Sequence, residues 1–590
     1  MSSWWFRTKP RSILKTFKWF PYFAELEGQN WNYREDKFSN WNDKPVNLIR
    51  REFIYRSHWE ELEERYDSYE QFMEGTHDIN EIESTGRNDK TTFEFYGLGY
   101  VDGHGNIRVT KAGNIVKTGK MDDNILLKLL LKLQFPSPAT KKSRDSNYVF
   151  PLEIILNVYK YFDDLNKFEL GYLFMCNDIE KIDITIKAIR EFKKRYKELE
   201  NKTKLPDVVS IFTEIMKRYF PEITNKPETY YRDYSDALIR TLEYTGLFSQ
   251  RGRSYYVKLF IPEHAKMKVK LLQDQYEFIY NSEESFEEYM EWYGNPYNIL
   301  LPWEEKNNIR LIIDKKLEIY KRRLNEAEEK ITNFKAEEKI NEIREIQEVK
   351  IKNEDMLLEL DKDLSQSLIS LNEELFVKYN SKTAIAREEI IEKFIDILEG
   401  NEDMSALWLE CNTWKSLVAI NGSHYVKRNF KVEEDLSPRA FAPGIGNTPD
   451  MELYENGYIL IPEVSLMTGV RQWEHEGSSV IDHVFKFIKQ YEEKQVIGIF
   501  ISSAMNIRTI WQFFILNRES WMGNPVPVVP ITIKQYIGII DFLYKNDLHI
   551  RDFKELVENI HKDTFNYLTF KEWEENIDTS IFKWKTAKAS

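Results

Sequence analysis

Two acidic residues flank a hairpin signal in the last third of the sequence. Asp450 follows Asn447-Thr448-Pro449, and Glu463 follows Ile461-Pro462. Between the two acids, two apolar runs meet at Asn456-Gly457, a dipeptide that strongly favours a two-residue β-hairpin turn. A turn at this dipeptide pairs Glu455 with Tyr458, Leu453 with Leu460 and Met451 with Pro462, and it places Asp450 opposite Glu463.

Paired carboxylates at the open end of a hairpin could bind a metal ion. Cross-strand partners have Cβ atoms about 4.5–5.5 Å apart and share one face of the sheet. Two negative charges at that separation repel each other, and a divalent cation between them removes the repulsion. A solvated hairpin whose acids face water is the alternative, and the spacing alone leaves both interpretations open.

Length and composition exclude several classes of protein. The chain has 590 residues, of which 42% are hydrophobic and 31% charged, so we expect several folded domains with apolar cores. Its two cysteines, Cys176 and Cys411, do not form a disulfide framework and fit a reducing compartment. The sequence has no uninterrupted apolar run of about 18 residues and no apolar signal segment. We therefore expect a cytoplasmic protein with no membrane contact.

Two stretches of the first half are locally basic, although the net charge is −14. Residues 1–20 contain no acid; Arg7, Lys9, Arg11, Lys15 and Lys18 alternate there with Trp4, Trp5, Phe6, Trp19 and Phe20. Such an arm suits phosphate contact and base stacking, and a packed N-terminal segment with solvated lysines is the alternative. The second stretch, 251–270, has one acid among basic residues that include Arg251 and Arg253.

The order of elements in the first half predicts two winged helix-turn-helix units. Phe95–Asp102 and Asn106–Thr110 are expected to form strands around a Gly-His-Gly turn, and Thr110 would cap a helix over Lys111–Lys117. A similar order recurs later, with a helix over Asp236–Tyr244 and a hairpin through Gln250–Arg253 to Tyr255–Val257. Two such units favour a bipartite DNA reader, with helices in the major groove and wings on the backbone. A winged fold can also bind protein, so that interpretation stays open.

Residues 304–400 have the pattern of long helices. A heptad seam runs through seven apolar positions: Ile313, Leu317, Tyr320, Leu324, Ala327, Ile331 and Phe334. An intermolecular coiled coil is one interpretation of this seam. An intrachain helical hairpin is favoured, because a second apolar series over Met356–Leu371 can fold back on the first.

The last 190 residues predict a small α/β domain. Helices are expected over Glu402–Ile420, Glu474–Lys489 and Lys534–Tyr544. The apolar run Gln495–Ser502 predicts a strand covered on both faces, and Val526–Ile533 predicts an edge strand. Helix, acidic hairpin, helix, buried strand and edge strand together indicate a nuclease core.

The segment NTPDMELYENGYILIPEVSLMTGVRQWEHEG resembles the catalytic segment of type IIS restriction endonucleases and nicking endonucleases of the AlwI, MlyI and BstNBI kind. That segment is a variant of the PD-(D/E)xK nuclease motif. Four further segments resemble the front half of that family in the same order: YGLGYVDGHGNIRVTKAG, LKLQFPS, YTGLFSQRG and EWYGNP. The similarity thus extends through most of the chain.

The resemblance implies a multidomain α+β protein in which recognition and cleavage are separate. Its parts would be two winged-helix-type DNA-recognition subdomains (1–145 and 146–302), a helical linker (303–400) and an α/β PD-(D/E)xK cleavage domain (401–590). Such enzymes bind a short asymmetric site, in several relatives one containing GAGTC or GGATC, and cut a few nucleotides outside it. They depend on Mg²⁺ and act on double-stranded DNA. Implied partners are a second copy through the cleavage domain, or a separate small nuclease subunit, and a bacterial DNA methyltransferase.

The resemblance also implies a ligand set. Carried over residue by residue, the metal-site and catalytic acids are Asp450, Glu463, Glu410 and Glu476, and the backbone carbonyl of Val464 would be a further ligand. Glu410 as a helix-surface residue, and Glu476 as part of a locally acidic segment, remain alternatives. His475 and His483 are expected to be ordinary helix residues, because magnesium prefers oxygen ligands. For DNA contact the candidates are Arg7, Lys9, Arg11, Arg251 and Arg253, with phosphates expected more than base edges.

One position departs from the general motif. The motif places a lysine two residues after the second acid, and this chain has Ser465 there. A serine supplies no positive charge, so a second metal ion or Arg471 would have to compensate, and the general base stays unassigned. Three hypotheses follow: a site-specific endonuclease that nicks or cuts both strands, a sequence-specific DNA-binding protein with a degenerate nuclease domain, and a helical scaffold.

Overall fold

The structure, a computed structural model of the 590-residue chain, divides into two compact units. The first comprises 1–250 and 254–315, and the second comprises 316–590 with 251–253. The structure describes residues 4–39, 45–58, 72, 79–140, 148–199, 204–251, 257–331, 334–341, 343, 356–399, 405–423, 425–432, 436–438, 448–469, 472–518 and 525–589. The division into four parts predicted from the sequence is finer than these two units and stays a prediction.

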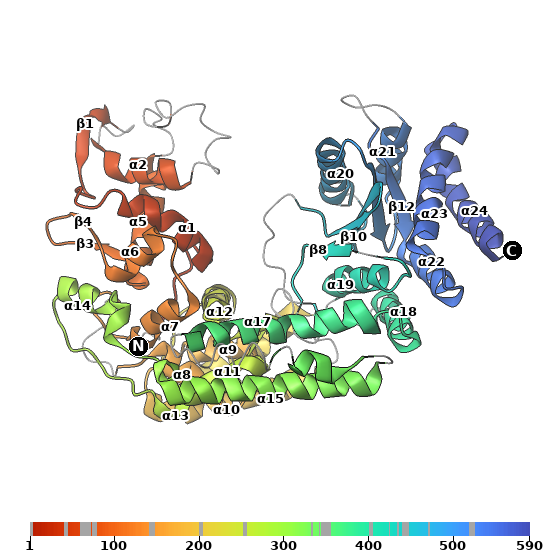
Figure 1. The fold of residues 1–590 in the computed structure, drawn as a ribbon. Coiled ribbons are helices and arrows are strands. Elements are labelled where there is room, and N and C mark those ends of the chain that lie inside the picture. The colour runs from red at the N-terminus through yellow and green to blue at the C-terminus, as the bar shows by residue number, and fades with distance from the viewer. Residues whose placement is uncertain are drawn as a thin grey trace. The chain divides into compact units, whose positions relative to one another are not determined.

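The first unit begins with helices around short hairpins (Figure 1). Its elements up to residue 132 are α1 (Ile13–Ala24), β1 (Arg34–Ser39), β2 (Pro45–Asn47), α2 (Leu48–Ser57), α5 (Ile79–Phe95), β3 (Gly99–Val101), β4 (Ile107–Val109), α6 (Lys111–Lys117) and α7 (Asp123–Lys132). Strands β3 and β4 pair antiparallel, and Thr110 Oγ1 accepts from Gly113 N at the start of α6, as predicted. Because α5 continues through Phe95, the first strand is shorter than expected. The helix–hairpin–helix order is confirmed, and the winged-helix fold itself stays a prediction.

The remainder of the first unit is largely helical. Its elements are α8 (Pro151–Val158), β5 (Asp164–Asn166), α9 (Lys167–Leu173), α10 (Ile182–Lys197), α11 (Leu205–Tyr219), α12 (Ser235–Tyr244), β6 (Ser249–Arg251), β7 (Lys258–Phe260), α13 (Lys266–Gln275) and α14 (Phe286–Tyr293). The helix expected over Asp236–Tyr244 is confirmed as α12. The second strand of its hairpin is β7, which begins after the predicted Tyr255–Val257 and pairs with β5 as well as β6. Arg253 and the two tyrosines lie outside the described residues.

The aromatic side chains of the N-terminal arm are packed into the protein. Trp4 and Phe20 are fully buried and Phe6 is 2% exposed. Trp4 Nε1 donates to Leu173 O at 2.8 Å, and the Phe20 ring packs on Phe93. These side chains are therefore not a surface on which bases stack, and the packed alternative is the one that the structure shows.

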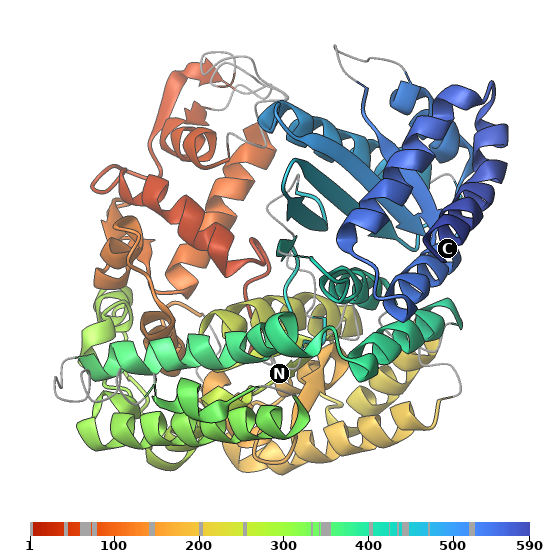
Figure 2. The ribbon, with the colours of Figure 1, turned by 45° about the vertical axis from the view of Figure 1, so that its right-hand side comes forward.

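The heptad seam folds back within the chain. Helices α15 (Lys306–Lys330) and α17 (Leu357–Leu375) lie side by side (Figure 1, Figure 2). One apolar cluster joins Tyr320, Leu324, Ala327, Ile331 and Phe334 to Leu368, Leu371 and Leu375. The favoured intrachain helical hairpin is confirmed. Helix α18 (Ala384–Glu399) follows.

The C-terminal domain is built on a mixed five-stranded sheet. Its elements are α19 (Ser405–Val418), β8 (Tyr425–Arg428), β9 (Met451–Glu455), β10 (Tyr458–Ser465), α20 (Ser478–Gln490), β11 (Gln495–Ser502), α21 (Ile507–Arg518), β12 (Val528–Thr532), α22 (Ile533–Lys545), α23 (Ile550–Asp563) and α24 (Phe570–Ala589). The strand order is β12-β11-β10-β9-β8. Strands β10, β11 and β12 are parallel, whereas β8 and β10 run antiparallel to β9.

Helices cover both faces of this sheet. Figure 1 shows α20 on one side and α22 and α23 on the other. The Cβ that an alanine would place at Gly498 in β11 would lie 2.6 Å from Val484, so α20 packs tightly against that strand. All of β11 after Gln495 is buried, as expected for a strand covered on both faces. The α/β arrangement predicted for the cleavage domain is confirmed.

In the C-terminal domain, too, some element boundaries differ from the sequence prediction. The helix expected over Glu474–Lys489 begins as a π-helical turn, Gln472–Gly477, before α20, and the edge strand is limited to Val528–Thr532. Val526 N donates to Leu516 O in α21 at 2.9 Å and not to a neighbouring strand, so the strand begins after it. Within the described residues, no helix is long and apolar enough to cross a membrane.

Candidate active site

The hairpin has the predicted register. Glu455 pairs with Tyr458 and Leu453 with Leu460 across the Asn456-Gly457 turn, where Gly457 has φ +85°. At the other end, Val464 N donates to Asp450 Oδ2 at 2.9 Å, and Asp450 N donates to Glu463 Oε2 at 3.4 Å. Asp450 and Glu463 therefore lie together at the open end of the hairpin, as predicted.

The two carboxylates sit where a charge is costly. The pKa of Glu463 is raised to about 8: burial is the largest cause, the charges of Glu476 and Glu410 add to the rise, and hydrogen bonds with Asp450 oppose it. Burial also raises the pKa of Asp450 well above its usual value, and the charges of Glu463 and Glu476 add to that shift. The site thus concentrates negative charge in a poorly solvated place, which favours either a proton or a cation between the acids.

The residue that follows strand β8 fixes the backbone that carries Asp450. Asn429 N donates to Asp450 O at 3.0 Å, and Asn429 Nδ2 donates to Pro449 O at 2.8 Å. Both bonds act on the main chain, so Asp450 is held from the β8 side by Asn429 and from β10 by Val464.

His483 lies in direct contact with Glu463. Its Nδ1 atom is 2.5 Å from Glu463 Oε1, and both side chains are buried. One proton must lie between atoms this close, and burial lowers the pKa of the imidazole, which favours a neutral ring. His483 lies in α20, as expected, and the expectation that it is not a metal ligand stays a prediction; its contact with Glu463 was not predicted from the sequence. A sequence signal did exist: His483 falls among Val480, Val484 and Phe487, on the apolar face of α20.

Gln472 anchors the turn that carries Glu476. This fully buried side chain donates from Nε2 to Met467 O, Ser502 Oγ and Ala504 O, at 2.9, 2.9 and 2.8 Å. Its Oε1 accepts from Asn506 N at 2.6 Å. The glutamine joins the end of β11 to the π-helical turn, and so positions the segment that precedes α20.

The other groups predicted to bind the metal ion are Glu410, Glu476 and the Val464 carbonyl. Glu410 in α19 and Glu476 are near enough to raise the pKa of Glu463. Among the described residues, however, no three Asp, Glu, His or Cys side chains are grouped as a metal site. The roles assigned to Glu410, Glu476 and the Val464 carbonyl therefore stay predictions. Ser465 Oγ accepts from Met467 N at 3.0 Å, and Arg471 and the His475 side chain lie outside the description.

The predicted DNA-contact residues are in different environments. Arg7 donates from Nε to Thr92 Oγ1 at 3.0 Å and from Nη2 to Asn88 O at 2.9 Å, and Arg11 is paired with Asp233 at 2.7 Å. Lys9 is exposed, and Arg251 is half-buried in β6. Arg7 is thus occupied within the protein, and DNA contact by the others stays a prediction.

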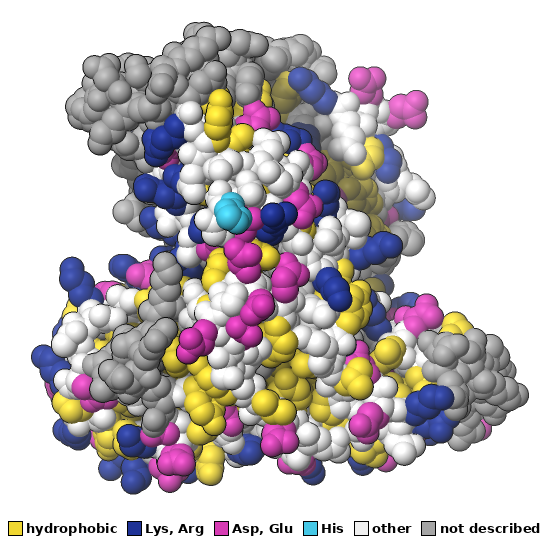
Figure 3. Space-filling view, turned by 90° about the vertical axis from the view of Figure 1, so that its left-hand side faces the viewer, with side chains coloured by type: hydrophobic (Ala, Val, Ile, Leu, Met, Phe, Trp, Pro, Cys, Tyr) yellow, Lys and Arg dark blue, Asp and Glu magenta, His cyan; other side chains and the backbone are white. Residues whose placement is uncertain are grey.

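Figure 3 shows one face of the molecule, on which basic and acidic side chains are interspersed over the described residues. A surface that holds DNA phosphates is expected to be dominated by lysine and arginine. On the face drawn in Figure 3, the described residues therefore form no surface dominated by lysine and arginine.

Three of the four motif segments of the first unit, 96–113, 131–137 and 291–296, pack against one another. Lys132 Nζ donates to Trp292 O, Asn295 O and Asn298 Oδ1 at 3.0, 2.7 and 2.9 Å. Tyr293 OH donates to Phe95 O at 2.8 Å. Ala112 N donates to Gly294 O at 2.8 Å, and Tyr244 OH donates to Met121 O, between the first two segments, at 3.2 Å. Much of this motif similarity therefore maintains the fold of the first unit.

Fold and site together define an α/β domain with a buried acid pair at the carboxyl end of parallel strands, where open α/β sheets place their active sites. The family model described as AlwI restriction endonuclease matches residues 96–539. That span is most of the chain, so the protein belongs to the AlwI restriction endonuclease family.

Comparison with solved structures gives a weaker likeness. One match is the small subunit of the heterodimeric restriction endonuclease R.BspD6I, with 17% sequence identity and a TM-score of 0.29. It covers 33% of this chain and 98% of that subunit. No curated protein matches the chain.

Proposed function

We propose that this protein is a magnesium-dependent, type IIS site-specific endonuclease. It binds a short asymmetric sequence of double-stranded DNA and hydrolyses phosphodiester bonds a few nucleotides outside that sequence. Membership of the AlwI family supports site-specific cleavage of DNA. The observation that carries the proposed chemistry is the contact of Asp450 with Val464 and Glu463 at the end of the hairpin.

The donor set fits a magnesium ion. Two carboxylates share the site, and burial opposes the ionisation of both. The charges of Glu463 and Glu476 further oppose ionisation of Asp450, and those of Glu476 and Glu410 oppose ionisation of Glu463. A hard divalent cation with oxygen ligands would stabilise the ionised pair. Bound there, Mg²⁺ would neutralise the phosphate, lower the pKa of a water molecule and stabilise the leaving oxygen.

The chain's own residues prepare the site for this chemistry. Val464 N fixes Oδ2 of Asp450, and Asn429 fixes the main chain on either side of that residue. His483 Nδ1 holds Oε1 of Glu463, which restricts the rotation of that carboxylate. In our proposal Asp450, Glu463 and the Val464 carbonyl bind the ion directly, and Glu410 and Glu476 hold its waters or a second ion.

The division of the chain into two compact units supports the type IIS assignment. The acid pair belongs wholly to the second compact unit, whereas the helix–hairpin–helix segment of 79–117 belongs to the first. In our proposal the first unit reads DNA through winged-helix-like elements. Cutting outside the recognition site would then follow, because one unit binds the recognition sequence and the other unit holds the cleavage site.

Ser465 supports a second candidate function. Without the motif lysine, the cleavage domain could be degenerate, and the protein would then be a sequence-specific DNA-binding protein. Strand specificity is also open to test, because one acid pair cuts one strand at a time. A second copy, or a small nuclease subunit, would complete double-strand cleavage, and a methyltransferase of the same specificity would protect the host DNA.

A plasmid assay distinguishes these functions. The purified chain is incubated with supercoiled plasmid DNA in Mg²⁺ and, separately, in EDTA. Discrete nicked or linear products that require Mg²⁺ support the endonuclease, and run-off sequencing of the ends locates each cut and shows whether it lies outside a common sequence. Site-selective binding without cleavage would support the DNA-binding alternative, and cleavage that persists in Asp450→Ala would contradict the assignment of this site.

A further inference from the structure

Edge strand β8 places a lysine on the same face of the sheet as the acid pair. The register pairs Lys427 with Glu452, and the bond from Asn429 N to Asp450 O continues that pairing by two residues. Side chains in paired strands alternate between faces. Lys427, Asn429, Asp450 and Glu452 therefore share one face, and Glu463 lies beside Asp450 on it.

The contacts of Glu452 confirm this arrangement. Its Oε1 accepts from Lys427 Nζ at 2.8 Å and from Asn429 Nδ2 at 2.8 Å, and its Oε2 accepts from Tyr454 OH. Glu452 is 3% exposed, but the Lys427 side chain is 45% exposed. The carboxylate thus has two partners besides the lysine, and the ammonium group keeps donors for a ligand outside the protein.

Arg428 is the contrasting neighbour on β8. It is on the opposite face by alternation, and its Nη2 donates to Glu373 Oε2 at 2.6 Å. Its side chain is 23% exposed. The two adjacent cations of this strand therefore differ: Arg428 joins the strand to α17, and Lys427 points to the side of the acid pair.

The spacing suits a DNA strand. Glu452 follows Asp450 by two residues, which is roughly 7 Å along a strand. Each DNA strand carries one negative charge per ~3.4 Å of helix axis. A lysine at this distance from the acid pair is within reach of a phosphate next to the one that is cut.

We propose that Lys427 binds a backbone phosphate of the DNA strand held at Asp450 and Glu463, and so supplies part of the positive charge that Ser465 does not. This inference rests on the proposed endonuclease function. Lys427 is a phosphate-binding residue here, and Asn429 and Glu452 are positioning residues that hold its strand against β9.

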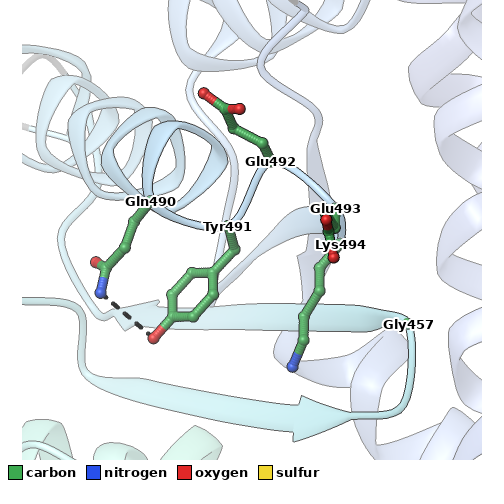
Figure 4. A pocket seen from close by; sticks show the side chains of 6 residues that line it. All are labelled: Gly457, Gln490, Tyr491, Glu492, Glu493 and Lys494. Carbon is green, nitrogen blue, oxygen red and sulfur yellow. Dashed lines mark hydrogen bonds between the residues drawn. The ribbon is translucent and has the colours of Figure 1, made fainter.

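The other end of the hairpin provides a matched control. A hollow of about 480 Å³ is lined there by Gly457, Gln490, Tyr491, Glu492, Glu493 and Lys494 (Figure 4). Lys494 Nζ lies 5.9 Å from the centre of the Tyr454 ring and 5.8 Å from that of Tyr491. Two acids adjoin this lysine, and it is at the turn end, away from the acid pair, so we expect no phosphate there.

The test compares Lys427→Gln, Lys427→Arg and Lys494→Gln in the full chain, with supercoiled plasmid DNA as the probe. Cleavage rates are measured from about 50 to 200 mM salt, and melting temperatures are recorded in parallel. Loss of a charge-assisted hydrogen bond predicts a fall in kcat/KM of roughly tenfold to a hundredfold for Lys427→Gln. The slope of log kcat/KM against log salt should become shallower by about 0.9. Lys427→Arg should keep most of the rate, and Lys494→Gln all of it.

A double variant separates phosphate binding from a structural ion pair. If Lys427 only neutralises Glu452, then Lys427→Gln combined with Glu452→Gln should recover cleavage. Under our proposal the double variant recovers thermal stability but not the rate or the salt slope. The inference would be overturned if Lys427→Gln left the cleavage rate and salt slope unchanged, or if the double variant recovered both. Cleavage by the unaltered protein would still support the proposed function in either case. Absence of any cleavage by the unaltered protein would overturn both.

Discussion

Val464 N donates a 2.9 Å hydrogen bond to Asp450 Oδ2 across the end of the β9–β10 hairpin. Pro462 has no N–H group, so the regular backbone ladder cannot continue through that position. Beyond Pro462, the carboxylate of Asp450 accepts the hydrogen bond from the β10 main chain, in place of a backbone carbonyl of the paired segment. Because the donor is main chain in a buried strand, it fixes the acid without adding a positive charge, and it leaves the charge of the site to be balanced by something else.

The acid pair should be essential for cleavage and costly for stability. Replacing Asp450 with Asn removes a charge whose burial and repulsion by Glu463 raise its pKa. We expect cleavage to fall by at least about a hundredfold, because a direct metal ligand is lost. The melting temperature in EDTA should rise or stay unchanged.

The matched control for that variant is Glu492→Gln, an exposed acid at the turn end of the same hairpin. It should change neither cleavage nor stability. A large drop in the EDTA melting temperature of Asp450→Asn would contradict the view that the two carboxylates repel each other.

Stability of the metal-free protein should depend on the ionisation of Glu463. Its pKa is about 8 in the folded protein against 4.5 for the ordinary group. A folded pKa above the unfolded one stabilises the protein below about pH 4.5, and that stabilisation is lost as the pH rises towards 8. In EDTA the contribution of this group to the free energy of unfolding should fall by on the order of a few kcal/mol over that interval.

Denaturant titrations at several pH values measure this loss. Glu463→Gln should flatten the dependence, and saturating Mg²⁺ should reduce it in the unaltered protein, because a bound cation stabilises the ionised form. An equally steep dependence in Glu463→Gln would show that another group is responsible.

His483 should determine how tightly the acid pair holds its ion. The ring contacts Glu463 Oε1 at 2.5 Å and orients the carboxylate. In His483→Ala we expect the Mg²⁺ concentration for half-maximal cleavage to rise about tenfold to a hundredfold. His483→Asn, which keeps a side-chain hydrogen-bond donor near this position, should recover part of the loss.

For comparison, His104→Ala changes an exposed histidine in the first unit and should leave the Mg²⁺ dependence unaltered. If His483→Ala lowers cleavage equally at all Mg²⁺ concentrations, its role is not in orienting the ligand.

Gly294 should be required for the fold of the first unit. A Cβ at this position would lie 2.4 Å from Gly97 O and 2.5 Å from Thr110 Cβ, both of them within another motif segment. Gly294→Ala should therefore destabilise the first unit by about 1–3 kcal/mol and weaken plasmid binding as a consequence. Calorimetry measures the change. Gly103→Ala, whose Cβ would meet only Glu287 Oε1 at 3.4 Å, should melt like the unaltered protein.

Local sequence was sufficient for the β9–β10 hairpin, the helical hairpin and the buried strand β11. Asn456-Gly457 sets a two-residue turn, and a turn sets the register of the residues that follow it. The turn therefore fixes the pairing as far as Leu453 and Leu460, and counting on from it predicted that Asp450 and Glu463 meet, as their hydrogen bonds show. The heptad seam similarly predicted the partner of α15, because an apolar stripe of that period must be covered by another helix.

The features that the sequence left open or did not predict depend on contacts between distant segments. His483 is 20 residues from Glu463, and no local rule directs its ring to that carboxylate. The aromatic residues of the N-terminal arm pack against Leu173 and Phe93, so their spacing alone could not distinguish stacking on DNA from burial. The proximity of Lys427 to the acid pair likewise requires β8 to lie beside β9.

The sequence by itself determined which two acids meet, because turn geometry and strand alternation act over a few residues. Only the tertiary structure decided which residues from other elements support them: a histidine from α20 on Glu463, a lysine from an edge strand on Glu452 and a glutamine that anchors the turn before α20. These neighbours come from separate elements, and packing of the sheet and its helices brings them together. Burial in that packing is also what raises the pKa of both acids.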